Sequence, residues 1–227
     1  MAKPQRLALF DLDHTLIPFD SGREWLQFLA DRYAVPEDAP RRYLDACRRY
    51  VAGRVGLEAL HRAVVCPPGA QAQALFSTWR RDFEAEMARR VPRSTLALVQ
   101  RHRDAGDLCA IVTATSRLVA EPFARVFGVA QLLATEPHRA GDGSLSGDIQ
   151  GEPCHREHKV AHVRRWLAAQ GLALQDFERS WFYSDAAGDL PLLEAVTDPV
   201  AVRPDDKLRA VARERGWQVL GIADVAF

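Results

Sequence analysis

The fold is decided by the stretch Leu7-Ala8-Leu9-Phe10-Asp11-Leu12-Asp13-His14-Thr15-Leu16. Its four leading apolar residues are too few for a helix and lack polar alternation, which is typical of a strand buried on both faces of a parallel sheet. Two acids follow at once, and residues two apart in an extended chain face the same side. Ligands of open α/β sheets bind beyond the carboxyl ends of the strands, so Asp11 and Asp13 stand where chemistry is expected.

Two carboxylates that face one point repel each other unless a cation or a shared proton relieves them. The pair Asp11 and Asp13 therefore indicates a metal site, or one acid that is protonated and can donate. The same two residues also fit a turn that caps the next helix, because short motifs have many chance matches.

Outward from this stretch, short apolar runs alternate with segments of helical periodicity. The runs predict strands at Leu108–Val112, Trp181–Tyr183, Val200–Val202 and Val219–Ile222. The periodic segments predict helices at Arg93–His102, Arg117–Phe127, Arg156–Ala169, Pro191–Val196 and Lys207–Arg215. This alternation predicts a doubly wound (Rossmann-like) α/β domain with a mostly parallel sheet. Asp142-Gly143, between β-compatible stretches, predicts a hairpin that projects from the sheet.

Residues 19–90 break the alternation with helical periodicity alone. Pro36, Gly53 and the cluster Cys66-Pro67-Pro68-Gly69 divide them into what reads as four helices. Ser21-Gly22-Arg23-Glu24 has the S-x-x-E form of a capping box and predicts the start of the first helix. We therefore expect an α/β core of residues 1–18 and 91–227, with residues 19–90 inserted after the first strand as a helical cap domain.

Chemistry-bearing side chains follow several of the predicted strands. Asp185 and Asp189 come after Trp181–Tyr183, where carboxylates suit Mg²⁺ together with a substrate phosphate, although Asp189 alone also fits a helix N-cap. Thr113 could hold phosphate oxygens at a strand end or cap a helix. Lys159 falls in a first helical turn, where the macrodipole disfavours a cation, unless it is a solvated surface lysine.

The order of acid pair, hydroxyl, lysine and acid pair resembles the haloacid dehalogenase superfamily, in its phosphoserine-phosphatase-like branch (subfamily IB). Its four motifs are matched by residues 11–16, by Thr113, by Lys159 and by Asp185-Ala186-Ala187-Gly188-Asp189-Leu190-Pro191. The resemblance covers essentially the whole chain. The insert also falls where that branch carries its small helical cap.

The resemblance implies a Mg²⁺-dependent phosphatase that works through an aspartyl-phosphate. Asp11 would be the nucleophile, and Asp13 the general acid and then the base. The metal ligands would be Asp11, Asp13 through its main-chain carbonyl, and Asp185. Asp189 would act from the metal's water shell or on Lys159.

The resemblance also implies phosphate-binding roles for Thr113 and Lys159, with Leu12 and Ala114 as further phosphate-binding positions. Ala114 stands where the branch often has Gly, and Ala186 where it often has Ser or Gly. Neither departure removes a reacting group.

The expected substrate is a small phosphomonoester, phosphoserine-like or histidinol-phosphate-like. Asp20 stands where the phosphoserine enzymes carry a longer Glu that contacts the substrate amine. A substrate carboxylate would need an arginine from the cap, for which the candidates are Arg41, Arg42, Arg48, Arg49 and Arg54. Four histidines lie near the motifs or between them without an assigned role: His14, His138, His155 and His158.

Other functions use similar residues. A phosphotransferase would pass the phosphoryl group from Asp11 to an alcohol. A receiver module also carries Asp, Mg²⁺, Thr and Lys on a doubly wound sheet, but it is about half this length and lacks an acid two residues after the phosphorylated Asp. A non-catalytic phosphate-binding module would not need the full set of reacting groups found here.

Composition excludes several classes of function. The 227 residues are 48% hydrophobic and 26% charged, as in ordinary globular proteins. Lys plus Arg and Asp plus Glu both number 30, which argues against binding a nucleic-acid backbone. The four cysteines form no C-x-x-C pair, and no secretory or membrane-spanning segment is evident. We expect a cytoplasmic protein whose partner is a small phosphorylated metabolite, with no nucleic-acid or membrane partner.

Overall fold

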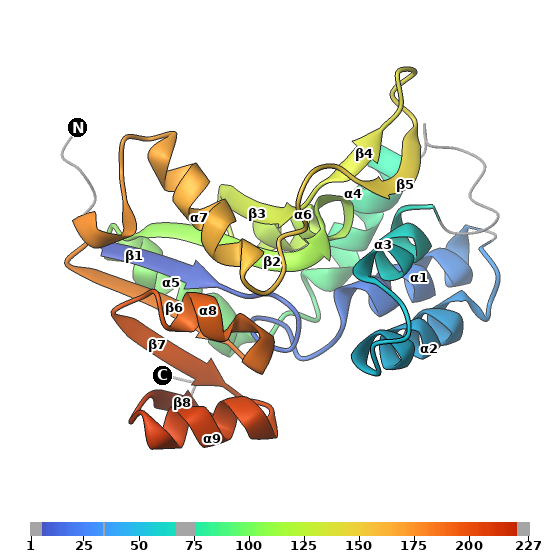
Figure 1. Cartoon of the computed structure of the whole chain (residues 1–227). Helices are drawn as coiled ribbons and strands as arrows, with labels where there is room; N and C mark the ends of the chain where they lie inside the picture. The colour runs from blue at the N-terminus through green and yellow to red at the C-terminus, as the bar shows by residue number, and fades with distance from the viewer. Residues whose placement is uncertain (1–5, 34, 67–75, 222–227) are drawn as a thin grey trace.

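The centre of the computed structural model, which describes residues 6–33, 35–66 and 76–221, is a six-stranded parallel sheet (Figure 1). Its strands follow the order β3-β2-β1-β6-β7-β8. Their bounds are β1 Arg6–Phe10, β2 Leu108–Ser116, β3 Gln131–Thr135, β6 Arg179–Ser184, β7 Asp198–Val202 and β8 Gln218–Leu220. The predicted doubly wound α/β fold is confirmed.

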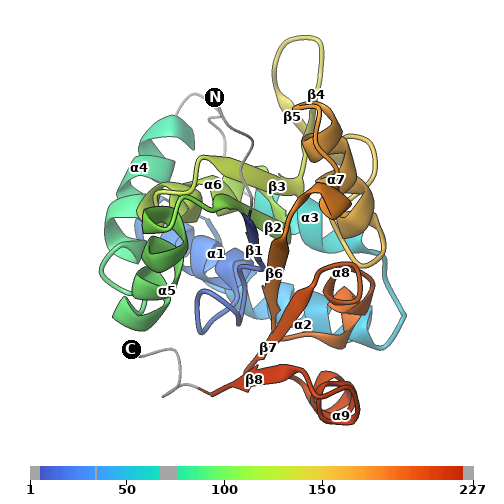
Figure 2. The same ribbon diagram turned by 90° about the vertical axis from the view of Figure 1, so that its left-hand side faces the viewer.

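Helices cover both faces of this sheet (Figure 2). One face carries α5 (Arg93–Asp104) and α6 (Arg117–Val126), and the other carries α7 (His158–Ala168), α8 (Leu190–Leu193) and α9 (Asp206–Glu214). Strand β1 shows why its sequence lacks alternation. Leu7 and Leu9 pack into the core under α7, whereas Ala8 and Phe10 pack into the core on the α5 side.

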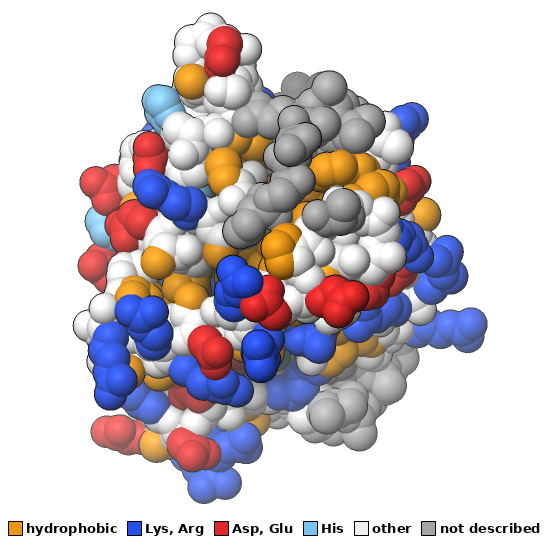
Figure 3. All heavy atoms as spheres, turned by 90° about the vertical axis from the view of Figure 1, so that its right-hand side faces the viewer, with side chains coloured by type: hydrophobic (Ala, Val, Ile, Leu, Met, Phe, Trp, Pro, Cys, Tyr) orange, Lys and Arg blue, Asp and Glu red, His pale blue; other side chains and the backbone are white. Residues whose placement is uncertain are grey.

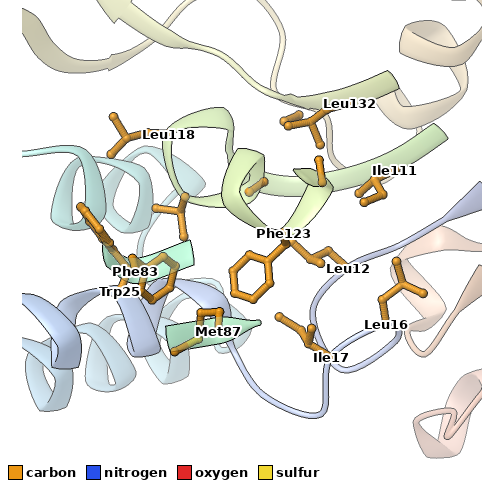
Figure 4. Packing of buried hydrophobic residues seen from close by; sticks show 14 of the residues in the cluster. Leu12, Leu16, Ile17, Trp25, Phe83, Met87, Ile111, Leu118, Phe123 and Leu132 are labelled. Carbon is orange, nitrogen blue, oxygen red and sulfur yellow. The ribbon is translucent and has the colours of Figure 1, made fainter. Parts of the chain in front are cut away.

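Four helices lie between β1 and α5 in the described residues, beyond the carboxyl ends of the strands (Figure 1). They are α1 Ser21–Arg32, α2 Ala39–Val51, α3 Leu57–Val65 and α4 Phe76–Met87. Trp25 and Phe83 from these helices share one hydrophobic core with Phe123 of α6 and Leu12 after β1 (Figure 4). The four predicted helices are therefore present, whereas the domain boundaries at 18/19 and 90/91 stay a prediction. Residues 67–69 of the predicted breaker cluster lie outside the described residues.

The predicted capping box at the start of α1 is wrong. Asp20 is the N-cap, and its Oδ1 accepts a hydrogen bond from the N–H of Arg23 at 2.8 Å. Its extended backbone (φ −83°, ψ 117°) is the conformation that an N-cap requires. Ser21 is consequently one residue inside the helix, and its hydroxyl lies 3.2 Å from the hydroxyl of Thr115. Glu24 pairs with the side chains of Arg23 and Arg90.

Several further elements differ from the prediction. Helix α8 ends at Leu193 rather than at Val196, and Ile222, the predicted end of the last strand, lies outside the described residues. Strand β2 continues to Ser116, so Thr113 lies within the strand rather than after it. Strand β3 at Gln131–Thr135 was not predicted. Helix α7 begins at His158, because Arg156 has a left-handed backbone (φ 49°) that a helix cannot include. The predicted hairpin is confirmed as β4 (Pro137–Arg139) and β5 (Leu145–Ile149), which pair antiparallel.

The hairpin does not stand free of the cap helices, since β5 packs along α3. The side chain of Arg62 pairs with Asp148, and the thiol of Cys66 donates to the carbonyl of Leu145. None of the helices in the described residues combines the length and the apolar character that crossing a bilayer requires.

Candidate active site

The loop after β1 is held by its apolar residues. Leu12, Leu16 and Ile17 are fully buried and point into the core between the sheet and the cap helices (Figure 4). The carbonyl of Leu12 accepts from the N–H groups of Leu16 and Ile17 at 2.9 and 3.1 Å. His14 takes a left-handed backbone (φ 58°) and is exposed. This tight turn holds the buried Asp11, which directly follows β1, at the carboxyl end of the sheet.

Lys159 joins two of the predicted acids. Its Nζ donates to Asp11 Oδ1 at 2.8 Å and to Asp189 Oδ2 at 2.7 Å, and the ammonium group is almost completely buried. Ser184 also donates to Asp189 Oδ2 at 2.7 Å. Burial would lower the pKa of Lys159, but Asp11 and Asp189 outweigh it and raise that pKa above its ordinary value. Lys159 is therefore a fixed positive charge beside Asp11, and a solvated surface lysine is excluded.

Asp11 and Asp185 converge on one hydroxyl. Thr15 Oγ1 lies 3.1 Å from Asp11 Oδ2 and 3.0 Å from Asp185 Oδ1. Burial raises the pKa of Asp11 to about 6, against the lowering effect of Lys159. Burial and then the charge of Asp11 raise the pKa of Asp185 to about 7. The carboxylates at the ends of β1 and β6 thus meet at one hydroxyl, whereas the residue spacing predicted a common point for Asp11 and Asp13.

Asp13 belongs to a separate hydrogen-bond network. Its Oδ1 accepts from the N–H of Ser21 at 2.9 Å, and its Oδ2 accepts from the hydroxyl of Thr115 at 2.6 Å. Burial, followed by the charge of Asp20, raises the pKa of Asp13 to about 6. A carboxyl that gains and loses a proton near neutral pH is suited to general acid–base work.

The predicted phosphate-binding residues surround the same end of the sheet. Thr113 is buried, and its hydroxyl oxygen accepts from the N–H of Thr115 at 3.1 Å. Ala114 borders the pocket described below, and its carbonyl accepts from Thr135. The side chain of Leu12 is buried in the core, so only its main chain could meet a phosphate. These roles stay predictions.

A pocket of about 180 Å³ opens between the cap helices and the sheet, and Asp13 and Asp20 both line it. Gly22 and Tyr43 also line it. A side chain at position 22 would not fit, because its Cβ would lie only 2.6 Å from the hydroxyl of Tyr43. The five candidate arginines of the cap are exposed and do not line this pocket. Figure 3 shows the molecule from the side of the cap helices, where Lys and Arg side chains are interspersed with Asp and Glu on the outer surface.

Of the four unassigned histidines, His155 lines the pocket, where the hydroxyl of Tyr50 lies 2.9 Å from its Nε2. His138 is exposed on the hairpin, and His158 lies near Glu152 and Glu157. The histidines of the motif regions are thus divided between the pocket wall and the surface.

Arg203, which no sequence motif indicates, supports the loop after β1. Its Nη2 donates to the carbonyls of His14 and Thr15 at 2.6 and 2.8 Å. Two residues later, the N–H of Asp205 donates to the carbonyl of Asp185 at 2.8 Å. The segment after β7 therefore fixes both acid-bearing loops. Thr15, Ser21 and Thr115 were also missed, and only Thr15 carried a signal, its place inside the first motif.

The site fits the divalent cation that the resemblance implies. One hydroxyl proton on Thr15 can serve only one of the two carboxylates at a time, so Asp11 and Asp185 still need positive charge between them. Carboxylate and carbonyl oxygens are the donors that Mg²⁺ prefers, and it usually keeps several waters. The described residues contain no cluster of three or more metal-binding side chains. The ligand set that the resemblance implies contains only two side chains, those of Asp11 and Asp185, beside the main-chain carbonyl of Asp13, so it would not form such a cluster.

Residues 8–194 match the family described as haloacid dehalogenase-like hydrolases. The chain belongs to this family. It is 33% identical over 218 residues to a histidinol-phosphatase of Neisseria meningitidis serogroup C (strain 8013), covering 95% of this chain and 98% of the relative. It is 30% identical over 223 residues to the phosphoserine phosphatase SerB1 of Mycobacterium tuberculosis, covering 93% of this chain and 69% of the relative. This family member is a phosphoric monoester hydrolase.

Solved structures agree on the fold. A protein of unknown function from Bordetella pertussis Tohama I superimposes with a TM-score of 0.88 at 43% identity, covering 96% of this chain and 99% of that one. A substrate-bound phosphoserine phosphatase superimposes with a TM-score of 0.61 at 16% identity, covering 97% of this chain and 94% of that one. At that identity the likeness concerns the fold alone.

Replacing Lys159 with methionine is expected to lower the free energy of unfolding by about 3–5 kcal/mol, because Asp11 and Asp189 lose their buried partner. The loss should be largest near about pH 8 and smaller near about pH 5. Asp11 has a raised pKa, so its unfavourable charge appears only as the pH rises through that value, and without the ammonium group the pKa rises further. Denaturant unfolding in EDTA at both pH values measures this. Lys207→Met, an exposed lysine, is the matched control, and an equal loss at both pH values would contradict the prediction.

Proposed function

We propose that the protein is a Mg²⁺-dependent phosphatase that hydrolyses a small phosphomonoester through an aspartyl-phosphate on Asp11. The observation that supports this most is the position of Asp11. One of its carboxylate oxygens is held by the buried ammonium group of Lys159, and the other faces Asp185 across Thr15. Phosphoryl transfer depends mainly on positioning and on neutralising charge, and this arrangement offers both.

The residues that would hold Mg²⁺ are Asp11, Asp185 and the main-chain carbonyl of Asp13. When bound, the ion supplies positive charge that orients the phosphate and offsets its oxygens. Lys159 provides a second, permanent positive charge beside Asp11.

The chain's own groups then account for two displacements. A carboxylate oxygen of Asp11 attacks phosphorus, and the bond from phosphorus to the ester oxygen breaks. Asp13 gives its proton to the departing alkoxide. Asp13, now ionised, takes a proton from water, whose oxygen attacks the phosphoryl group and releases phosphate and free Asp11. Dividing hydrolysis into two steps in this way is ordinary covalent catalysis.

The substrate is a small amino acid or amino alcohol phosphate, phosphoserine-like or histidinol-phosphate-like. The two curated relatives are named for these two substrates. The size of the pocket, about 180 Å³, supports a small leaving group, since pockets for drug-sized ligands usually exceed about 300 Å³.

Phosphate release from phosphoserine, histidinol phosphate and p-nitrophenyl phosphate, each with Mg²⁺ and with EDTA, tests the proposal. We expect release with Mg²⁺ and almost none with EDTA, restored when excess Mg²⁺ is added. Added alcohols should not create new phosphate esters. Metal-independent release would overturn the metal assignment, and transfer to the alcohols would favour a phosphotransferase.

A further inference from the structure

The pocket has an unusual balance of charge for a site that binds a phosphate ester. Two carboxylates line it, those of Asp13 and Asp20, whereas none of its described lining residues is Lys or Arg. In the proposed function the phosphate would be bound by Lys159, which is beside Asp11 and is not one of the lining residues. In the proposed mechanism Asp13 is protonated when the ester binds, so a second negative group on the substrate would face the carboxylate of Asp20 without a counter-charge among the described lining residues, which is a costly arrangement.

Two polar atoms of the pocket wall have no hydrogen-bond partner among the residues that the structure describes. His61 Nε2 and Ser116 Oγ are buried and unpaired, and both residues line this pocket. His61 is 4% exposed and Ser116 is 3% exposed, so bulk water does not satisfy them. An unpaired buried polar group costs about 1–3 kcal/mol, and such groups are rare unless a ligand or a bound water completes them.

His61 is suited to accept a hydrogen bond. Burial lowers the pKa of His61 below its usual range, against the opposing effects of the Asp148 backbone and carboxylate, so the ring is neutral near pH 7. A neutral imidazole has one N–H and one acceptor nitrogen. With the proton on Nδ1, the unpaired Nε2 keeps a free lone pair on a residue of the pocket wall.

The other histidine of the pocket does not supply the missing positive charge. His155 is engaged by the hydroxyl of Tyr50. Burial and then Arg156 and Lys159 lower the pKa of His155 to about 4, against Asp189 and Glu157, so it too is neutral near pH 7. The lining thus combines negative charge with neutral acceptors and hydroxyls.

We propose that the substrate is the phosphate ester of an amino alcohol that has no carboxylate, and that His61 Nε2 accepts a hydrogen bond from a nitrogen donor of this leaving group. His61 is then a residue that determines specificity, and Ser116 is the second polar contact of the same wall. The inference rests on the proposed phosphatase function and separates the two substrate types that remain within it. Phosphoserine carries the carboxylate that this pocket disfavours.

Substrate preference of the wild-type protein is the first test. O-phosphoserine and O-phosphoethanolamine differ only in the carboxylate, so their ratio isolates its effect. We expect kcat/KM with Mg²⁺ to favour phosphoethanolamine by about 100-fold, since like charges placed together cost several kcal/mol. Histidinol phosphate, an amino alcohol ester with further nitrogen donors, should be better still. A preference for phosphoserine would overturn the inference.

Variants of His61 test the contact itself. We expect His61→Phe to raise the KM for histidinol phosphate about tenfold with little change in kcat, as for a lost hydrogen bond. Turnover of p-nitrophenyl phosphate, which has no amine, should stay within about twofold. His61→Gln, which keeps an acceptor, should recover part of the loss. His138→Phe on the exposed hairpin is the matched control.

The outcomes separate this inference from the function on which it rests. Equal losses for histidinol phosphate and p-nitrophenyl phosphate in His61→Phe would mean a structural role and would overturn the specificity assignment. If the wild-type protein hydrolyses none of the esters with Mg²⁺, the proposed function itself fails. If His61→Phe does not fold, the comparison of phosphoserine with phosphoethanolamine still decides the substrate class.

Discussion

Replacing Asp11 with asparagine is expected to lower kcat for every phosphate ester by at least about 10⁴-fold, because an amide does not attack phosphorus. The fold should persist. Asparagine has the same shape, and Lys159 keeps its 2.7 Å contact with Asp189. Burial and then the charge of Asp11 raise the pKa of Asp185, and the variant removes the second of these causes.

Initial rates with Mg²⁺ and thermal unfolding of the same samples measure both parts of this expectation. Acid quenching followed by intact-protein mass measurement adds a direct readout, since the wild-type protein should carry one phosphoryl group and Asp11→Asn none. Asp206→Asn, at an exposed position on α9, is the matched control. A folded Asp11→Asn protein that retains a tenth of the activity would falsify the nucleophile assignment.

The architecture was largely predictable because burial leaves a simple pattern. Residues such as Leu7 and Phe10 are apolar on both sides of a strand that is covered on both faces, and that pattern needs no knowledge of distant contacts. Strand β3 was missed although Leu132, Leu133 and Ala134 form an equally short apolar run. Such a run, by itself, does not distinguish a strand from part of a helix.

Local capping was less predictable. Asp20 and Ser21 are both good N-cap residues, and their intrinsic preferences are nearly equal. The choice depends on tertiary contacts, because the N–H and the hydroxyl of Ser21 are used by Asp13 and Thr115. Neither partner is near Ser21 in a local sequence window.

The residues of the candidate site likewise include some that the sequence predicts and some that it does not. Asp11, Lys159 and Asp189 were predicted as a set, and the structure brings them into direct contact. Arg203 and His61 were not, since an arginine after a strand and a histidine on a helix have no local signature. Their positions acquire meaning only when the loop after β1 and the pocket wall are seen beside them.

Replacing Asp13 with asparagine should lower kcat for alkyl phosphate esters by about 10²–10⁴-fold, the usual contribution of a general acid–base group. Burial holds the pKa of Asp13 at about 6, so the wild-type carboxyl can both give and take a proton near neutral pH, whereas an amide can do neither. An asparagine oxygen can replace only one of the two acceptors that serve Ser21 and Thr115. The free energy of unfolding should therefore fall by about 1 kcal/mol.

The choice of leaving group separates the two roles proposed for Asp13, general acid and general base. A p-nitrophenolate ion departs without a proton, so the first displacement in Asp13→Asn should remain fast with p-nitrophenyl phosphate. The second displacement still lacks a base to activate water. Rapid mixing should then show a burst of nitrophenolate equal to the enzyme concentration, followed by slow turnover, with the phosphoryl group retained on the protein. An alkyl phosphate should show no burst, because its first step also needs the proton. A burst with both esters would assign leaving-group protonation to another residue.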